Sequence, residues 1–162
     1  MSALKIRVYP DPILRKKAVP VDSFDSELEK FIEEMFIVMR KEDGVGLAAP
    51  QVGVSRQIAV VSYEGKNYVL INPKVLELSG SERREEGCLS VPGVYEEVER
   101  PSHVVVEAYD EKGDLRKITG DGFLARAFLH EIDHLQGKLF IDYLSVLKRQ
   151  LIKKKLRKYR KE

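Results

Sequence analysis

Residues 130–134 read His-Glu-Ile-Asp-His, and this segment constrains the fold more than any other because its chemistry requires a helix with one face turned inward. On a helix, His130 and His134 share one face, with Cβ atoms about 5–6 Å apart, so two imidazoles can bind one metal ion. Glu131 points about 100° away from His130, where it can act on a water without joining the ligands. The alternative is a surface helix with two titratable histidines, but Glu131 and the apolar flanks favour a metal site.

A catalytic metal site needs a third protein ligand and an open position. Downstream of Gly137 the acids are Asp142 and Glu162, and neither lies in the ligand motif of a zinc protease. Upstream, Cys88 lies in the segment Glu-Gly-Cys-Leu-Ser, where Gly87 frees the backbone at the start of what we expect to be a loop. A lone cysteine is more often a buried apolar thiol, but a two-histidine site that lacks a ligand favours Cys88 as the third one.

Composition is that of a small globular protein. The chain has 162 residues, 43% hydrophobic and 33% charged, so one domain over residues 1–162 with a buried core is expected. The single cysteine has no intramolecular disulfide partner, which suits a reducing compartment. No segment has the apolar length of a signal peptide or a membrane span. We therefore expect a cytoplasmic protein with no membrane contact.

Local patterns predict helices near both ends and strands between them. Three prolines in residues 1–25 indicate an extended arm. A first helix is predicted from Ser26, with a capping box between Ser26 and Glu29 and a stop near Gly44. Its apolar residues recur at helical spacing and are Leu28, Phe31, Ile32, Met35 and Met39.

Residues 57–119 alternate in short apolar runs and are predicted to form antiparallel strands, with turns at residues 64–65, 79–80 and 112–113. A second helix is predicted from about Asp121 to Gly137, and a basic C-terminal helix over about 143–162. The predicted fold is α+β, with antiparallel sheets packed around a central metal-binding helix that carries residues 130–134.

A third segment, residues 44–53, is rich in glycine and other small residues and reads GVGLAAPQVG. Its small residues allow another chain to approach closely, and Gln51 offers an amide donor. Alone this pattern is weak, because small-residue turns are common. Together, GVGLAAPQ, EGCLS and HEIDH resemble the peptide deformylases in order and spacing, and the resemblance runs from the N-terminal arm to the C-terminal helix. Two departures are Leu129, where many relatives have glutamine, and Tyr95, where some bacterial members place a substrate-binding arginine.

The resemblance implies removal of the formyl group from the N-terminal formylmethionine of nascent polypeptides, with release of formate. Its implied metal ligands are Cys88, His130 and His134. Glu131 would activate the metal-bound water, and the Gln51 amide and the Leu89 backbone N–H would stabilise the oxyanion.

The family also implies how the substrate and the metal are bound. Backbone groups of Val45, Gly46 and Gly87 would bind the extended substrate peptide by strand addition. The ion is expected to be Fe²⁺ in the cell, and Zn²⁺, Ni²⁺ and Co²⁺ are the alternatives.

Charged residues outside these motifs leave further alternatives open. Asp133 and Arg100 form either a support behind the metal or a plain surface ion pair. Glu86 is expected to lie with Glu85 in a solvent-exposed run of charged residues. The alternative is that Glu86 orients the loop that carries the ligand. His103 is expected to be half-exposed and without a role.

The tail after residue 147 holds nine of the 28 Lys and Arg residues and one of the 26 acidic residues. Leu144, Leu147 and Leu151 are predicted to face the protein body, with the basic residues exposed. We expect transient contact with ribosomal RNA and none with DNA; a helix that only aids solubility is the alternative.

Two other functions fit parts of the sequence. A zinc endopeptidase would use the same helix to cleave internal amides. A metal-stabilised ribosome-binding module would explain the basic tail, but a structural ion needs no base such as Glu131.

Overall fold

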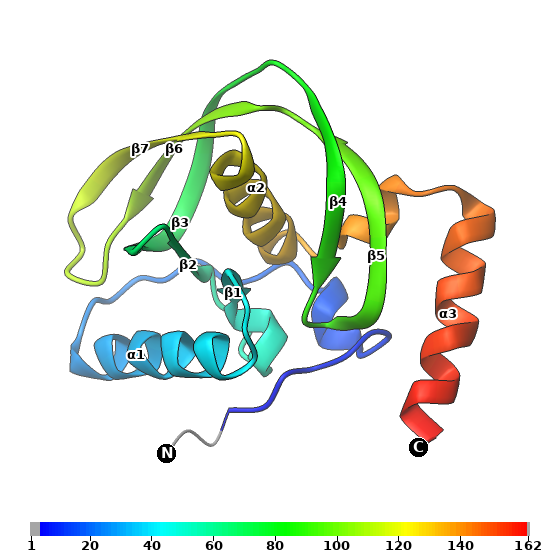
Figure 1. Cartoon of the computed structure of the whole chain (residues 1–162). Coiled ribbons are helices and arrows are strands. Elements are labelled where there is room, and N and C mark those ends of the chain that lie inside the picture. Colours follow the sequence, from blue (N-terminus) through cyan, green and yellow to red (C-terminus); the bar gives the residue numbers. More distant parts are fainter. Residues whose placement is uncertain (1–3, 162) are drawn as a thin grey trace.

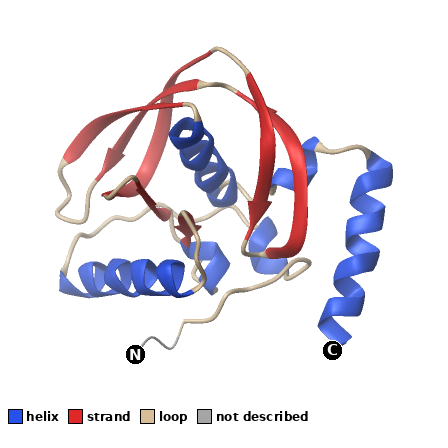
Figure 2. Ribbon diagram, viewed as in Figure 1, coloured by secondary structure: helices blue, strands red, loops and turns tan. Residues whose placement is uncertain are grey.

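The protein has an α+β fold, which confirms the predicted class (Figure 1, Figure 2). The structure is a computed structural model that describes residues 4–161, with side chains described through residue 157. The α-helices are α1 (Ser26–Lys41), α2 (Phe123–Leu135) and α3 (Val146–Lys161). The short 3₁₀ helices are η1 (Pro12–Arg15), η2 (Ala49–Val52) and η3 (Phe140–Tyr143).

The strands form two antiparallel sheets. They are β1 (Gly46–Ala48), β2 (Ile58–Tyr63), β3 (Lys66–Ser79), β4 (Glu82–Cys88), β5 (Val91–Arg100), β6 (His103–Tyr109) and β7 (Leu115–Asp121). Five strands pair in the order β1-β2-β3-β6-β7, and β4 pairs with β5 in a separate ribbon. The predicted turns at residues 64–65 and 112–113 close hairpins. The turn at residues 79–80 instead leads from one sheet to the other, because β3 pairs with β6.

Helix α2 lies between the five-stranded sheet and the β4–β5 ribbon (Figure 1). Its Ala125 and Phe128 are fully buried in a core shared with Val61 and Leu70 of the sheet. The helix ends beside Gly137, whose φ of +76° is a left-handed conformation that glycine adopts without strain. Burial on several faces makes this helix a rigid support for the polar residues near its C-terminal end.

Helix α1 covers the first part of the sheet with a stripe of buried residues that includes Met35 and Met39. The predicted capping residue is wrong by one position. The Asp25 side chain, instead of that of Ser26, accepts the hydrogen bond from the Leu28 N–H at 2.9 Å. A carboxylate both accepts this bond and interacts favourably with the positive end of the helix dipole.

The prediction for the inward face of α3 is also wrong. Leu147 and Leu151 are 66% and 59% exposed, whereas Ile152 and Leu156 are buried against the β4–β5 ribbon. Leu144 precedes the helix and is partly buried. The apolar residues on both faces of α3 have helical spacing, so the sequence pattern alone does not determine which face is buried. The position of the β4–β5 ribbon determines it.

Candidate metal centre and active site

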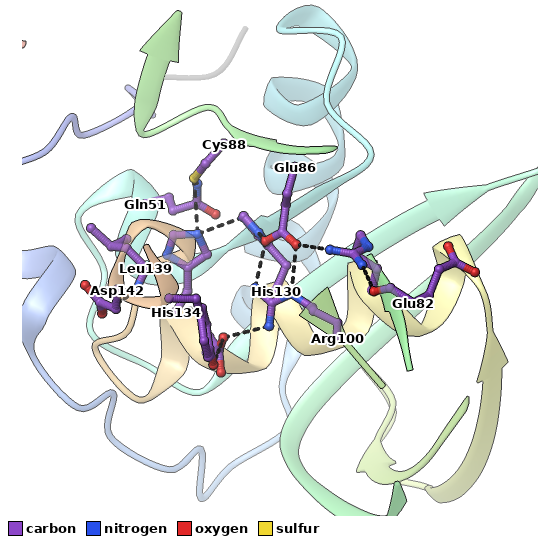
Figure 3. Close-up of polar contacts among 12 residues, drawn as sticks. Gln51, Glu82, Glu86, Cys88, Arg100, His130, His134, Leu139 and Asp142 are labelled. Atoms are coloured by element: carbon purple, nitrogen blue, oxygen red, sulfur yellow. Dashed lines mark hydrogen bonds and ion pairs between the residues drawn. The ribbon is translucent and has the colours of Figure 1, made fainter. Parts of the chain in front are cut away.

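Three sulfur and nitrogen atoms from distant parts of the chain meet beside α2. Cys88 Sγ lies 3.3 Å from His134 Nε2, and the Nε2 atoms of His130 and His134 are 3.2 Å apart. All three atoms lie within 4.8 Å of one another. Figure 3 shows the side chains of β4 and α2 turned toward one another. The structure therefore brings together the two histidines of one helix and the cysteine 42 residues upstream of His130.

Cys88 is the last residue of β4, whereas the sequence analysis placed it in a loop. The register of the ribbon shifts between Gly87 and Cys88, so that Gly87 lies opposite Tyr95 and Cys88 opposite Val91. Such an irregularity redirects a side chain out of the regular alternation of a strand. The thiol is thus positioned by a hydrogen-bonded ribbon.

These three atoms fit a divalent ion that prefers sulfur and nitrogen ligands. Nitrogens about 2.0–2.1 Å from an ion lie roughly 3.4 Å apart in a tetrahedral site, close to the separations found here. His130 Nδ1 lies 2.6 Å from Glu86 Oε2, a contact that fixes the proton on Nδ1 and leaves the Nε2 lone pair available. Burial lowers the pKa of His134 well below its ordinary value, which favours the neutral form that binds metals.

Glu86 is buried and forms the centre of a charged network (Figure 3), so the predicted solvated position is wrong for this residue. Arg100 Nε and Nη2 donate to its two carboxylate oxygens at 2.8 and 2.7 Å. Burial alone would raise the pKa of Glu86, but hydrogen bonds from Arg100 and His130 hold it well below its ordinary value. A permanently charged Glu86 can orient the His130 ring throughout the working pH range.

Arg126 belongs to the same network and was missed from the sequence. Its Nη1 donates to Glu86 Oε1 at 2.8 Å and its Nη2 to the Glu82 carbonyl oxygen at 2.7 Å. The available signal was a single arginine within an apolar helical run, because a buried cation requires an anionic partner.

Asp133 pairs with Arg100 Nη1 at 2.9 Å, and Arg100 is only 4% exposed. The pair is therefore not the plain surface ion pair that was one alternative. Tyr143 also donates to Asp133 Oδ2, at 2.8 Å. Through Arg100, the charges of Asp133 and Glu86 are held together directly behind His130.

Glu131 is buried beside the three converging atoms, and its Oε1 has no hydrogen-bond partner among the described residues. A Cβ atom at Gly46 would lie 2.5 Å from Glu131 Oε2, so glycine is what allows this carboxylate its position. Burial raises the pKa of Glu131 to about 7. A carboxyl group with that pKa can both accept and return a proton near neutral pH.

All of the predicted site residues except His134 line one cavity of about 870 Å³, and His134 lies buried behind it. Gln51, on η2, is fixed by the bond from the Ala48 N–H to its Oε1 at 2.9 Å. Its Nε2 lies 3.1 Å from Ser90 Oγ and 3.6 Å from Cys88 Sγ. The cavity walls also include Val45 and Leu89.

Tyr95 occupies part of the wall of this cavity. A Cβ atom at Gly87 would lie 2.6 Å from the Tyr95 ring, so the ring packs directly on the glycine backbone. His103 is partly buried and pairs with Asp121 on the neighbouring strand at 2.6 Å, away from the cavity.

Comparison with known proteins identifies the family of the chain. The polypeptide deformylase family model matches residues 3–150. The chain belongs to the polypeptide deformylase family. Peptide deformylase 1 of Shewanella oneidensis is 45% identical, with 100% of this chain and 98% of that protein aligned. A peptide deformylase of Thermotoga petrophila is 47% identical over 94% of this chain and 93% of its own length.

Solved structures of deformylases have the same fold. A peptide deformylase from Legionella pneumophila superposes with a TM-score of 0.95 at 46% identity, covering 99% of this chain and 96% of its own. One from Ehrlichia chaffeensis in complex with actinonin has a TM-score of 0.94 at 39% identity, covering 98% of each chain.

Membership of the deformylase family establishes the activity. The protein is a metal-dependent hydrolase that removes the formyl group from nascent peptides. Within residues 4–161, no helix combines the length and apolar character needed to cross a bilayer.

Proposed function

We propose that Cys88, His130 and His134 hold the metal ion of this deformylase. The observation that carries the proposal is the convergence of one thiol and two imidazole nitrogens within 4.8 Å. In this proposal α2 is the central metal-binding helix of one catalytic domain over residues 1–162, acting in the cytoplasm. The buried contacts of Glu86 with His130 support it, because metal-binding histidines are usually oriented in this way.

Fe²⁺ is the ion we propose in the cell, and Zn²⁺, Ni²⁺ and Co²⁺ are ions that the same ligands can accept. A thiolate with two imidazoles suits each of them. When bound, such an ion supplies a Lewis acid that lowers the pKa of water at the site toward about 7.

The proposed catalytic residues move the proton and stabilise the charge that develops on the formyl oxygen. Glu131 accepts the proton of the attacking water and returns it to the leaving amine, a role that its buried position and raised pKa support. The Gln51 Nε2 group and the Leu89 backbone N–H donate hydrogen bonds to the oxyanion, and both residues line the cavity. The products are formate and a peptide with a free N-terminal methionine.

We propose that the substrate peptide lies extended between two strand edges. Val45 and Gly46 belong to the β1 side of the cavity and Gly87 to the β4 side. β1 is an edge strand of the five-stranded sheet, so its outer backbone groups are available for strand addition. The absence of a side chain leaves room for the Glu131 carboxylate at Gly46 and for the Tyr95 ring at Gly87.

Metal removal tests the proposed centre. Protein purified without oxygen should contain about one divalent ion per chain and release formate from formyl-Met-Ala-Ser. Chelation should lower this rate at least about 100-fold, because the reaction depends on the ion, and Fe²⁺ or Ni²⁺ should restore it. Formate release and metal content are measured on the same samples.

The same assay includes a peptide with an unformylated N-terminus. It should remain intact, and cleavage of its internal amides would instead identify an endopeptidase. Full formate release by metal-free protein would contradict the proposed centre.

We also propose that α3 contacts ribosomal RNA, with no contact to DNA or membrane. The proposal is supported by Lys153, Lys154 and Arg157, which are exposed on the flank and outer side of the helix. A cationic surface of this kind binds phosphates and releases counterions. Removing α3 is a poor test of this contact, because it would also remove Ile152 and Leu156, which are buried in the core.

Charge neutralisation avoids this difficulty. Replacing Lys153, Lys154 and Arg157 by glutamine should weaken co-sedimentation with ribosomes at low salt at least about tenfold and flatten its salt dependence. Formyl-Met-Ala-Ser hydrolysis should be unchanged. A matched control replaces Lys16, Lys17 and Lys30, which are also exposed, and should sediment like the native chain. Equal sedimentation of both variants would leave α3 with a role in solubility only.

A further inference from the structure

A second hollow, of about 230 Å³, lies between β5 and α3, which run beside each other in Figure 1. Val94 and Ile152 are buried at this hollow, and Leu151 lines it from α3. Gly93 and Tyr95 line both this hollow and the 870 Å³ active-site cavity. The two hollows are therefore neighbours that meet at Gly93 and Tyr95.

The hollow has a mixed polar and apolar lining, and two of its large apolar side chains are exposed. Tyr95 is 65% exposed and Leu151 is 59% exposed, one on each element. A single exposed leucine is ordinary on a protein surface. Here the two large side chains flank a concave site whose buried residues are also apolar, which is the arrangement that accepts an apolar side chain from a partner.

The charges at the edge of the hollow are fixed by the β5–α3 contact. Lys148 pairs with Glu96 at 2.9 Å, so these two charges offset each other. Lys155 Nζ donates to the Gly93 carbonyl oxygen at 2.8 Å. An ammonium group has three donors, so Lys155 keeps two for another acceptor and keeps its positive charge.

We propose that this hollow binds the substrate polypeptide downstream of its reacting end. An apolar side chain of the nascent chain lies between Tyr95 and Leu151, and an adjacent carboxylate is attracted to Lys155. This inference rests on the proposed function, because it requires the formylated end to lie in the active-site cavity.

The shared lining residues Gly93 and Tyr95 place the hollow next to the active-site cavity, and this adjacency favours the substrate itself as the occupant. A formylated tripeptide extends about 10 Å, at about 3.3 Å per residue. A longer peptide that leaves the cavity past Tyr95 meets Leu151 and Lys155 next. The hollow between β5 and α3 would therefore contribute to binding only for longer chains. It would favour nascent proteins that carry an apolar and an acidic residue at the matching distance from the formylated end.

A peptide length series tests the proposal with the metal-loaded full chain. Each substrate begins with formyl-Met-Ala-Ser, continues with one to six Gly or Ser residues, and ends in Leu-Glu or in Ser-Gln. Above a threshold length, kcat/KM for the Leu-Glu peptide should exceed that for its Ser-Gln counterpart about three- to tenfold, the discrimination expected of a partly exposed apolar pocket.

Two exposed leucines on α3 provide matched variants. Leu151→Gln should remove the gain with Leu-Glu peptides and leave hydrolysis of formyl-Met-Ala-Ser unchanged. Leu147→Gln makes the same chemical change one turn earlier, at a residue that lines neither hollow, and should keep the gain. Lys155→Gln should remove only the part of the gain that depends on the glutamate.

A second measurement uses a peptide with a photo-cross-linking residue at the position that gives the largest gain in kcat/KM. This residue should label α3 near Leu151. Labelling elsewhere, equal rates for both peptide series at every length, or an undiminished gain in Leu151→Gln would overturn the proposal. Failure of the underlying catalytic assignment would appear differently, as formyl-Met-Ala-Ser hydrolysis that survives the loss of Cys88.

Discussion

Cys88→Ser is expected to lose the metal ion and nearly all formate release. A serine hydroxyl is neutral at pH 7, whereas the cysteine is bound as a thiolate that the cation stabilises directly. Replacing a residue that only supports a ligand typically lowers metal affinity or activity by about 10–100-fold. Replacing the ligand itself should therefore lower them at least about 100-fold. The metal-to-protein ratio and the rate of formate release measure the two effects.

A control for this variant removes a different side chain that can bind metals. His103→Gln lies away from the cavity, where His103 pairs with Asp121, and should retain both the ion and the activity. Thermal unfolding establishes that both variants are folded. Normal metal content and turnover in Cys88→Ser would show that the ligands have been assigned wrongly.

Glu131→Gln should lower kcat about 10²–10⁴-fold while the protein keeps its ion. Glutamine has nearly the same size but cannot take a proton from water. Stability should not fall, because the change removes a buried carboxyl group whose Oε1 has no partner among the described residues. Formate release, metal content and thermal unfolding are measured together. An unchanged kcat would show that Glu131 is not the group that takes the proton from the attacking water.

Gln51→Ala provides the comparison that separates proton transfer from oxyanion stabilisation. Loss of one oxyanion donor typically costs about 10²–10³-fold in kcat, with a smaller change in KM. This variant also leaves the buried Ala48 N–H without its acceptor, so its stability should fall, unlike that of Glu131→Gln. A change in KM alone would make Gln51 a residue that positions the substrate.

The parts of the site that depend on local geometry were predictable from the sequence. The four-residue spacing of His130 and His134 fixes their relation on any helix, and residues 130–134 do lie on α2. The position of Cys88 in the fold was not predictable in the same way. It depends on a register shift in the β4–β5 ribbon and on the docking of that ribbon against α2, which no short segment encodes.

Errors occurred where a tertiary contact decides between two locally acceptable patterns. Leu147 and Leu151 have the spacing of a buried stripe, yet the ribbon meets the Ile152 and Leu156 face. Glu86 follows another acidic residue and looks solvated in sequence, but Arg100 and Arg126 from distant elements surround it. In both cases the deciding partner is more than 10 residues away in the chain.

The burial of Ile152 and Leu156 has a consequence for how this protein folds as it is synthesised. These residues share one core cluster with Leu14, near the start of the chain, and with Val94 of the ribbon that carries Cys88. Contacts across so long a stretch form late, because closing a long loop costs entropy before the contacts can compensate for it. The cluster beneath the ribbon cannot be complete until residue 156 has left the ribosomal exit tunnel. The support beneath the ribbon that carries Cys88 is therefore completed late, only after residues near position 14 and residues of α3 can meet.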